Sequence, residues 1–244
     1  GDAEYRREIK IKQSKTGKRF FLFFEGVGSY AEVFLNDKKV GQHSGGRTTF
    51  TIDITDQLKT DGSKNELTVK ASHPANIQNL PWVCGGCSDE RGFSEGSQPM
   101  GIFRPVHLIV TNDVRIEPFG VHAWATIEKE QATLWVNTTF KNYSPGKRNV
   151  QLVQQLQDVS GKIVAQFATK LPVQMRTKDS MALLSTGIKV SNPVLWSVKN
   201  PYLYKIVSIV KENNVVLDKT ITDFGFRTIN WENPTNQFFL NGEP

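Results

Sequence analysis

The chain has 244 residues, of which 38% are hydrophobic, 10% aromatic and 22% charged. This composition excludes a disordered chain and a coiled coil, and the length favours two domains that each bury a core. No stretch approaches the roughly 20 consecutive apolar residues of a membrane helix, and the net charge of +6 comes from basic residues scattered along the chain. We therefore expect neither a membrane span nor a nucleic-acid partner.

The first half of the chain shows the two-residue hydrophobic period of half-buried strands. Phe50, Ile52 and Ile54 alternate with Thr and Asp. Further runs are rich in Val, Ile, Phe and Thr and are bounded by turn-forming residues, as in antiparallel sheets with one solvated face. These runs cover residues 19–25, 31–36, 66–71 and 106–111.

The interval from His73 to Met100 interrupts this pattern with many Gly and Pro residues, and a loop of that length is commonly functional or disordered. It combines carboxylates, a guanidinium and an indole. Proteins contact sugars with such groups, because carboxylates accept hydrogen bonds from hydroxyls and indole faces pack on C–H faces. The candidate substrate-binding residues are Trp82, Asp89, Glu90, Arg91 and Glu95. The alternative is a surface loop whose charges are solvated.

The same interval contains two motifs with other chemical meanings. Residues 92–96 match the G-x-S-x-G pattern of serine hydrolases, but that motif requires a strand before it and a helix after it, and neither is predicted here. Cys84 and Cys87 form a C-x-x-C without the second ligand pair that a closed zinc site needs. Two free thiols and a loop-closing disulfide both remain open, and we expect no metal and no cofactor.

The second half of the chain continues the strand pattern. Leu134, Val136 and Phe140 lie on one phase of an alternating run, further runs cover residues 150–156, 202–210 and 215–221, and no window shows a helical period. The sequence therefore predicts an all-β protein of two β-sandwiches, with a boundary near residues 112–118. Residues 229–244 fit neither sandwich and end in a hairpin signal with Asn241-Gly242 as its turn.

Several motifs occur in the order known from one enzyme family. The segments 24–27, 31–43 and 101–108 resemble the sugar-binding N-terminal domain of glycoside hydrolase family 2. The second half, with the motifs at 195–204 and 224–227, is similar to the immunoglobulin-like domain of that family. Residues 238–244 resemble the entry to its catalytic (β/α)₈ barrel.

The resemblance implies a domain plan. Residues 1–113 would form a jelly-roll-like sugar-binding sandwich that is truncated at its N-terminus, and residues 114–228 an immunoglobulin-like sandwich. Residues 229–244 would be a linker and the start of a missing (β/α)₈ barrel. The truncation would leave a sheet edge, near residues 5–9, that is exposed or pairs with a second copy of the chain.

The resemblance also implies a function. The chain would be the non-catalytic N-terminal portion of a retaining β-galactosidase-like exo-glycosidase, whose two catalytic glutamates lie in the barrel. The chain is expected to be inactive alone. Its carbohydrate partner, a β-galactoside or related β-linked glycan, would bind through that barrel. In the family an acidic residue just before the motif at Gly101 helps shape the substrate pocket; Glu95 lies near that place, with Asp89 and Glu90 as equal rivals.

Four further expectations accompany this reading. Enzymes of this kind from glycan-degrading bacteria are commonly exported, so a periplasmic or extracellular location is expected. An autonomous carbohydrate-binding or adhesion module and a structural protein that associates through a sheet edge are the alternative functions. Trp196, Tyr202 and Tyr204 are expected to pack in the core or between domains. Arg104 and Arg227 are expected to brace contacts between domains.

Overall fold

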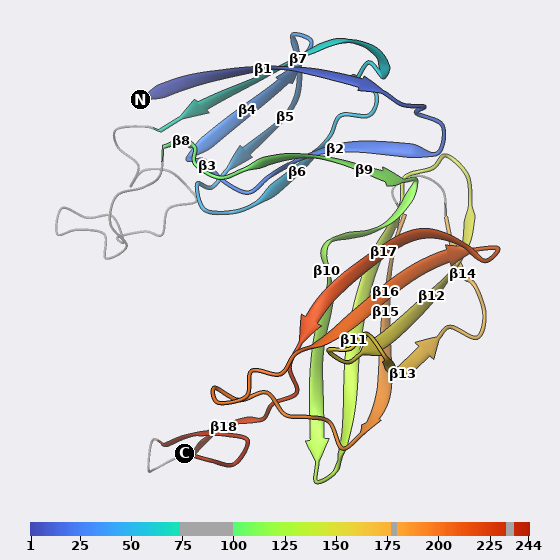
Figure 1. Ribbon diagram of the computed structural model, residues 1–244. Helices are drawn as coiled ribbons and strands as arrows, with labels where there is room; N and C mark the ends of the chain where they lie inside the picture. The colour runs from blue at the N-terminus through green and yellow to red at the C-terminus, as the bar shows by residue number, and fades with distance from the viewer. Residues whose placement is uncertain (74–99, 177–179, 233–236) are drawn as a thin grey trace, which may run out of the picture. The chain divides into compact units, whose positions relative to one another are not determined.

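The computed structural model describes residues 1–73, 100–176, 180–232 and 237–244. In these ranges the chain forms strands, turns and bends without a helix, which confirms the all-β prediction (Figure 1). No described segment is therefore a helix long and apolar enough to cross a membrane. The chain divides into two compact units, Gly1–Thr111 and Asn112–Pro244. The assignment of residues 229–244 to a linker and barrel entry stays a prediction.

The first unit is a sandwich of two antiparallel sheets. One sheet has the strand order β1-β7-β4-β5 and the other has the order β6-β2-β9, while β3 and β8 form a short separate ladder. The strands are β1 (Asp2–Lys12), β2 (Lys18–Phe24), β3 (Val27–Gly28), β4 (Tyr30–Leu35), β5 (Lys38–Ser44), β6 (Phe50–Asp53), β7 (Asp61–Ser72), β8 (Gly101–Ile102) and β9 (Val106–Asn112).

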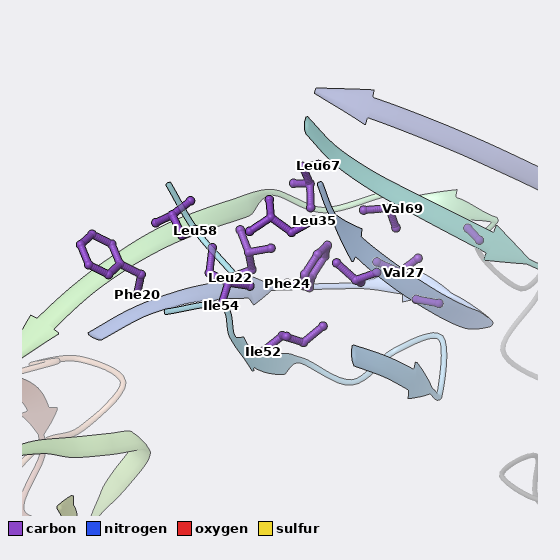
Figure 2. Packing of buried hydrophobic residues seen from close by; sticks show 13 residues of the cluster. Phe20, Leu22, Phe24, Val27, Leu35, Ile52, Ile54, Leu58, Leu67 and Val69 are labelled. Atoms are coloured by element: carbon purple, nitrogen blue, oxygen red, sulfur yellow. The ribbon is translucent and has the colours of Figure 1, made fainter. Parts of the chain in front are cut away.

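The core of the first unit follows from the alternation of its strands. In β4 every second residue, including Val33 and Leu35, is completely buried, because successive side chains of a strand point to opposite faces. Leu22 and Phe24 of β2 meet them from the other sheet (Figure 2). The Phe24 ring stacks on that of Phe50, with centroids 4.5 Å apart. Burial of these side chains holds the two sheets together.

The second unit is also a two-sheet sandwich. Strands β10-β11-β15 form one sheet and β13-β12-β16-β17 the other, with β14 added to β12 (Figure 1). Strands β18 and β19 form a two-stranded ladder of their own. The strands are β10 (Val114–Glu128), β11 (Gln131–Asn142), β12 (Arg148–Gln157), β13 (Ile163–Ala168), β14 (Val173–Met175), β15 (Ser180–Ser191), β16 (Tyr204–Glu212), β17 (Val215–Phe224), β18 (Ile229–Glu232) and β19 (Gln237–Leu240).

A polar group interrupts the apolar core of the second unit. Gln154 of β12 is completely buried, donates a hydrogen bond to the Thr138 hydroxyl of β11 and accepts one from the Ser208 hydroxyl at 2.7 Å. A buried amide costs free energy unless it is hydrogen-bonded, so this trio fixes how the two sheets face each other.

Tyr202 and Tyr204 pack in the interior of the second unit, as predicted from their strand pattern. Tyr204 is 5% exposed, its ring lies edge-on to Phe226, and its hydroxyl accepts a hydrogen bond from the Val194 amide at 2.9 Å. Tyr202 packs against Tyr204, with ring centroids 4.9 Å apart.

Candidate carbohydrate-contact sites

The predicted sugar-contact residues belong to the segment 74–99. Trp82, Asp89, Glu90, Arg91 and Glu95 therefore lie outside the described residues, and so do the C-x-x-C cysteines. Their proposed roles stay predictions. The structure does describe the positions where this segment leaves the first unit and where it returns.

Both ends of the segment are held at the same end of the first unit. At the leaving end, the Ser29 amide donates a hydrogen bond to the Ser72 carbonyl at 3.1 Å, and the Ser29 hydroxyl lies 3.0 Å from Nδ1 of His73. At the returning end, Gly101 of β8 pairs with Gly28 of β3. The adjacent residues 28 and 29 thus anchor both ends, which brings them together in space.

The returning end depends on a glycine. Gly101 has a φ of +67°, in the left-handed region that favours glycine. A Cβ at this position would lie 2.0 Å from the Tyr5 hydroxyl of β1. The absence of a side chain at Gly101 therefore lets the backbone of β8 pass close to Tyr5 of β1.

His43, at the same end of the first unit, lies in surroundings that favour its neutral imidazole. The His43 ring stacks on Phe50 with centroids 4.3 Å apart, and its Nε2 lies 2.8 Å from the Thr48 hydroxyl. Burial lowers the pKa of His43, because it disfavours the charged imidazolium. His43 is thus neutral at pH 7 and can both donate and accept a hydrogen bond.

The Ser29–His73 pair does not form a nucleophilic centre. Ser29 is only 2% exposed, and no carboxylate in the described ranges bonds to His73 as the orienting group of a triad would. This pair positions the backbone of the leaving end instead.

An open hollow lies on the outer face of the four-stranded sheet, beside the leaving end. It encloses about 530 Å³ and is bordered by Glu4, Tyr30, Glu32, Lys70 and Ser72, among others. Carboxylates, a phenol and an ammonium converge there, and together they supply the acceptors and donors that sugar hydroxyls require.

The polar groups of this hollow are held in place by their neighbours. Glu32 forms an ion pair with Lys39. The Tyr30 hydroxyl donates a hydrogen bond to Gln42 at 3.2 Å. The Lys70 ammonium lies 5.1 Å from the centroid of the Phe34 ring, a cation–π contact. Across the described ranges, no three His, Cys, Asp or Glu side chains gather as they would around a metal ion.

Comparison with known proteins assigns both units. Residues 1–80 match the galactose-binding-like domain of glycosyl hydrolase family 2, and residues 114–227 match the domain described as glycosyl hydrolases family 2. The chain is 29% identical to a β-glucuronidase of Formosa agariphila over all of this chain and 25% of that protein. It is also 29% identical to the β-galactosidase BoGH2A of Bacteroides ovatus, over 98% of this chain and 26% of that one.

A solved structure shows the same arrangement of strands. A glycosyl hydrolase family 2 member from Bacteroides cellulosilyticus superposes with a TM-score of 0.81 at 26% identity, covering 100% of this chain and 31% of the other. The chain thus spans about a quarter to a third of the length of the relatives it matches. Two matched domains in succession cover most of the sequence, and the chain therefore belongs to glycoside hydrolase family 2, of which it comprises the galactose-binding-like and immunoglobulin-like β-sandwiches.

Proposed function

We propose that the chain is the non-catalytic portion of a glycosidase that hydrolyses β-galactosides or related β-linked sugars. The observation that carries this proposal is the match of both sandwiches to family 2 proteins that are three to four times longer and are named β-galactosidases and β-glucuronidases. In the complete enzyme two glutamates of a (β/α)₈ barrel would perform a double displacement, one as acid/base and one as nucleophile. Neither belongs to this chain.

The first unit would contribute to substrate contact by holding the segment 74–99 against the catalytic part. Two features support this role. Both ends of the segment are anchored at residues 28 and 29, and the hollow bordered by Tyr30 and Glu32 opens beside the leaving end. Two ends fixed side by side reduce the conformational entropy that the segment loses when it contacts a sugar.

We also propose a periplasmic or extracellular location, because a polymeric glycan must be cut where the polymer is. Cell fractionation of the native organism tests this: the protein should appear outside the cytoplasmic fraction together with a marker of the exported compartment.

A hydrolysis assay tests the proposed function. The protein encoded by the complete native gene and the 244-residue chain are compared at equal molar concentration on 4-nitrophenyl β-galactoside and 4-nitrophenyl β-glucuronide. The complete protein is expected to turn over at least one of them, and the 244-residue chain neither. Turnover by the chain alone would contradict its non-catalytic role. Failure of the complete protein on every aryl β-glycoside tried would overturn the glycosidase assignment.

A further inference from the structure

Two tryptophans stand side by side on the outer face of the second unit. Trp124 of β10 lies directly opposite Trp135 of β11 in the antiparallel register, and the two strands run next to each other along the sheet (Figure 1). Their exposed fractions are 40% and 38%. The adjacent residues in each strand, such as Ala125 and Leu134, pack into the core, so both indoles point to the solvent.

The position of Trp135 leaves one face of its ring available. The indole lies against Gly187 of β15, where a Cβ would come within 2.9 Å of the ring. Because Gly187 has no side chain, the Trp135 ring can pack directly on the backbone of β15. A flat indole on a sheet offers a planar apolar surface to the solvent, as a stacking ligand requires.

A third tryptophan, which is half-buried, shares a groove with Trp124. Trp124 also borders an open groove of about 480 Å³ between β10 and β17, and Trp196 borders the same groove. We call Trp135, Trp124 and Trp196 the tryptophan track. Single exposed apolar residues are ordinary, but several large aromatic side chains gathered on one surface mark a contact surface.

Hydrogen-bonding groups accompany the track at the groove. Arg227 lines it, and its guanidinium lies 5.0 Å from the centroid of the Trp196 ring. No carboxylate in the described part of the chain forms an ion pair with Arg227, so the edge of its guanidinium can receive a ligand. Asp223 also lines the groove and pairs with Lys205 at 3.2 Å.

The outer strand face adds further polar groups beside the two paired indoles. The His122 ring lies 5.4 Å from that of Trp124, and His122 faces Asn137 across the strands. The Ser185 hydroxyl donates a hydrogen bond to Asn137 at 2.7 Å. Imidazole, amide and hydroxyl groups thus surround the aromatic surface.

This combination fits a carbohydrate better than other ligands. Indole faces match the C–H faces of pyranose rings, while guanidinium, carboxylate and amide groups bond to hydroxyls in the ring plane. Neighbouring strands are about 4.8 Å apart, so adjacent indoles contact one sugar or two in sequence. The carboxylate of Asp223 would repel a phosphate backbone, which disfavours a nucleic acid.

We propose that the immunoglobulin-like unit carries an accessory binding site for an oligosaccharide chain, which lies along Trp135, Trp124 and Trp196 and bonds to Arg227 and Asp223. This site goes beyond the proposed function, because it lies in the second unit and requires neither the barrel nor the segment 74–99. It would hold a polymeric substrate on the enzyme between successive cleavages.

Affinity electrophoresis of the chain tests this site. Native gels contain either β-1,4-galactan, which is neutral, or hyaluronan, which carries β-linked glucuronate. The chain is expected to be retarded in at least one of the gels, and the double variant Trp124→Ala/Trp135→Ala to bind about tenfold more weakly or worse, since aromatic anchors dominate binding energies. Trp231→Ala is the matched control: Trp231 is 61% exposed but lies on β18, outside the track. Its retardation should equal that of the unchanged chain.

The substitution Arg227→Met distinguishes the two kinds of glycan. Loss of retardation in hyaluronan with retention in galactan would assign Arg227 to a sugar carboxylate, and equal weakening in both would assign it to hydroxyls. The melting temperature of each variant shows that it is folded.

Absence of retardation in both gels would overturn the proposal, and so would equal retardation of the folded double variant and the unchanged chain. Because the gels measure binding without turnover, their outcome is separate from that of the hydrolysis assay on which the proposed function rests.

Discussion

Gly101 shows how a single residue position controls the anchoring of the segment 74–99. Substitution Gly101→Ala would introduce a Cβ 2.0 Å from the Tyr5 hydroxyl and place a non-glycine residue at a φ of +67°. We expect the free energy of unfolding of the first unit to fall by about 2 kcal/mol.

Removing the hydroxyl from the partner separates the two contributions. The double variant Gly101→Ala/Tyr5→Phe should recover part of the lost stability, because the closest contact disappears while the backbone strain remains. Urea unfolding of both variants and of Tyr5→Phe alone measures the coupling. Additive effects of the two substitutions would show that the hydroxyl contact does not contribute.

An ion pair between two strands of the second unit makes stability depend on pH. Arg148 of β12 bonds to the Glu212 carboxylate of β16 through its Nε at 2.9 Å and Nη2 at 2.7 Å, and the Asn149 amide donates to the same carboxylate at 3.0 Å. The bond from Arg148 holds the pKa of Glu212 below its usual value of 4.5. The folded state therefore binds this proton less tightly than the unfolded chain.

A depressed folded-state pKa stabilises the protein at pH values above 4.5 and ceases to do so as the pH falls through the folded pKa. We expect urea midpoints measured from pH 7 to pH 3 to fall more steeply for the unchanged chain than for Glu212→Gln. Arg148→Met should flatten the curve in the same way, because it removes the cause of the shift. Parallel curves for all three proteins would rule out this ion pair as a source of the pH dependence.

The turn between β4 and β5 both reverses the chain and bonds to other segments of the first unit. Asn36 and Asp37 have φ values of 52° and 63°, the left-handed pair of a tight hairpin turn. Asn36 also donates to the Gln57 carbonyl at 3.3 Å and to the Asn65 side chain at 3.0 Å, and it accepts from the Glu66 amide at 3.1 Å. The first turn residue thus ties the hairpin to the rest of the unit.

Glycine substitutions at the two turn positions should therefore have opposite effects. Asp37→Gly relieves the left-handed strain and is expected to raise the free energy of unfolding by about 0.5 kcal/mol. Asn36→Gly relieves the same strain but leaves buried partners unsatisfied, and a net loss of about 2 kcal/mol is expected. Chemical unfolding of the two variants checks this, and equal changes would show that the Asn36 bonds contribute nothing.

The elements themselves could largely be predicted from the sequence, since alternation fixes a strand and the face it buries. The runs at 19–25, 31–36, 66–71 and 106–111 correspond to β2, β4, β7 and β9. The reason for a polar residue at a core position could not be predicted, because it depends on partners distant in sequence. Gln154 is such a case, with Thr138 and Ser208 contributed by two other strands.

The tryptophan track illustrates the same limit for a site. Trp135 alternates with the apolar residues Leu134 and Val136, so the sequence pattern predicts that its side chain is exposed. The register that sets Trp124 opposite Trp135 is a tertiary property, and so is the groove that adds Trp196. Trp196, expected to be a packing residue, is half-buried against Arg227 and also borders the groove.

In the whole molecule, the composition of the segment 74–99 predicts contact with a sugar, and the first unit holds both ends of this segment. Its two ends are held at residues 28 and 29, in and beside β3, and its proposed contact with a sugar concerns the complete enzyme. The carboxylates Asp89, Glu90 and Glu95 are therefore best tested in the complete protein.

We expect one of the substitutions Asp89→Asn, Glu90→Gln or Glu95→Gln to lower kcat/KM on an aryl β-glycoside by about tenfold or more. A charged hydrogen bond to a sugar hydroxyl contributes roughly 1.5–3 kcal/mol, and its loss reduces binding correspondingly. Removal of a group that contacts substrate and transition state equally raises KM and leaves kcat unchanged, which separates binding from chemistry. Glu66→Gln, on the exposed face of β7, is the matched control and should behave as the unchanged enzyme. If all three variants keep the kcat/KM of that control, the segment does not contact the sugar through these carboxylates.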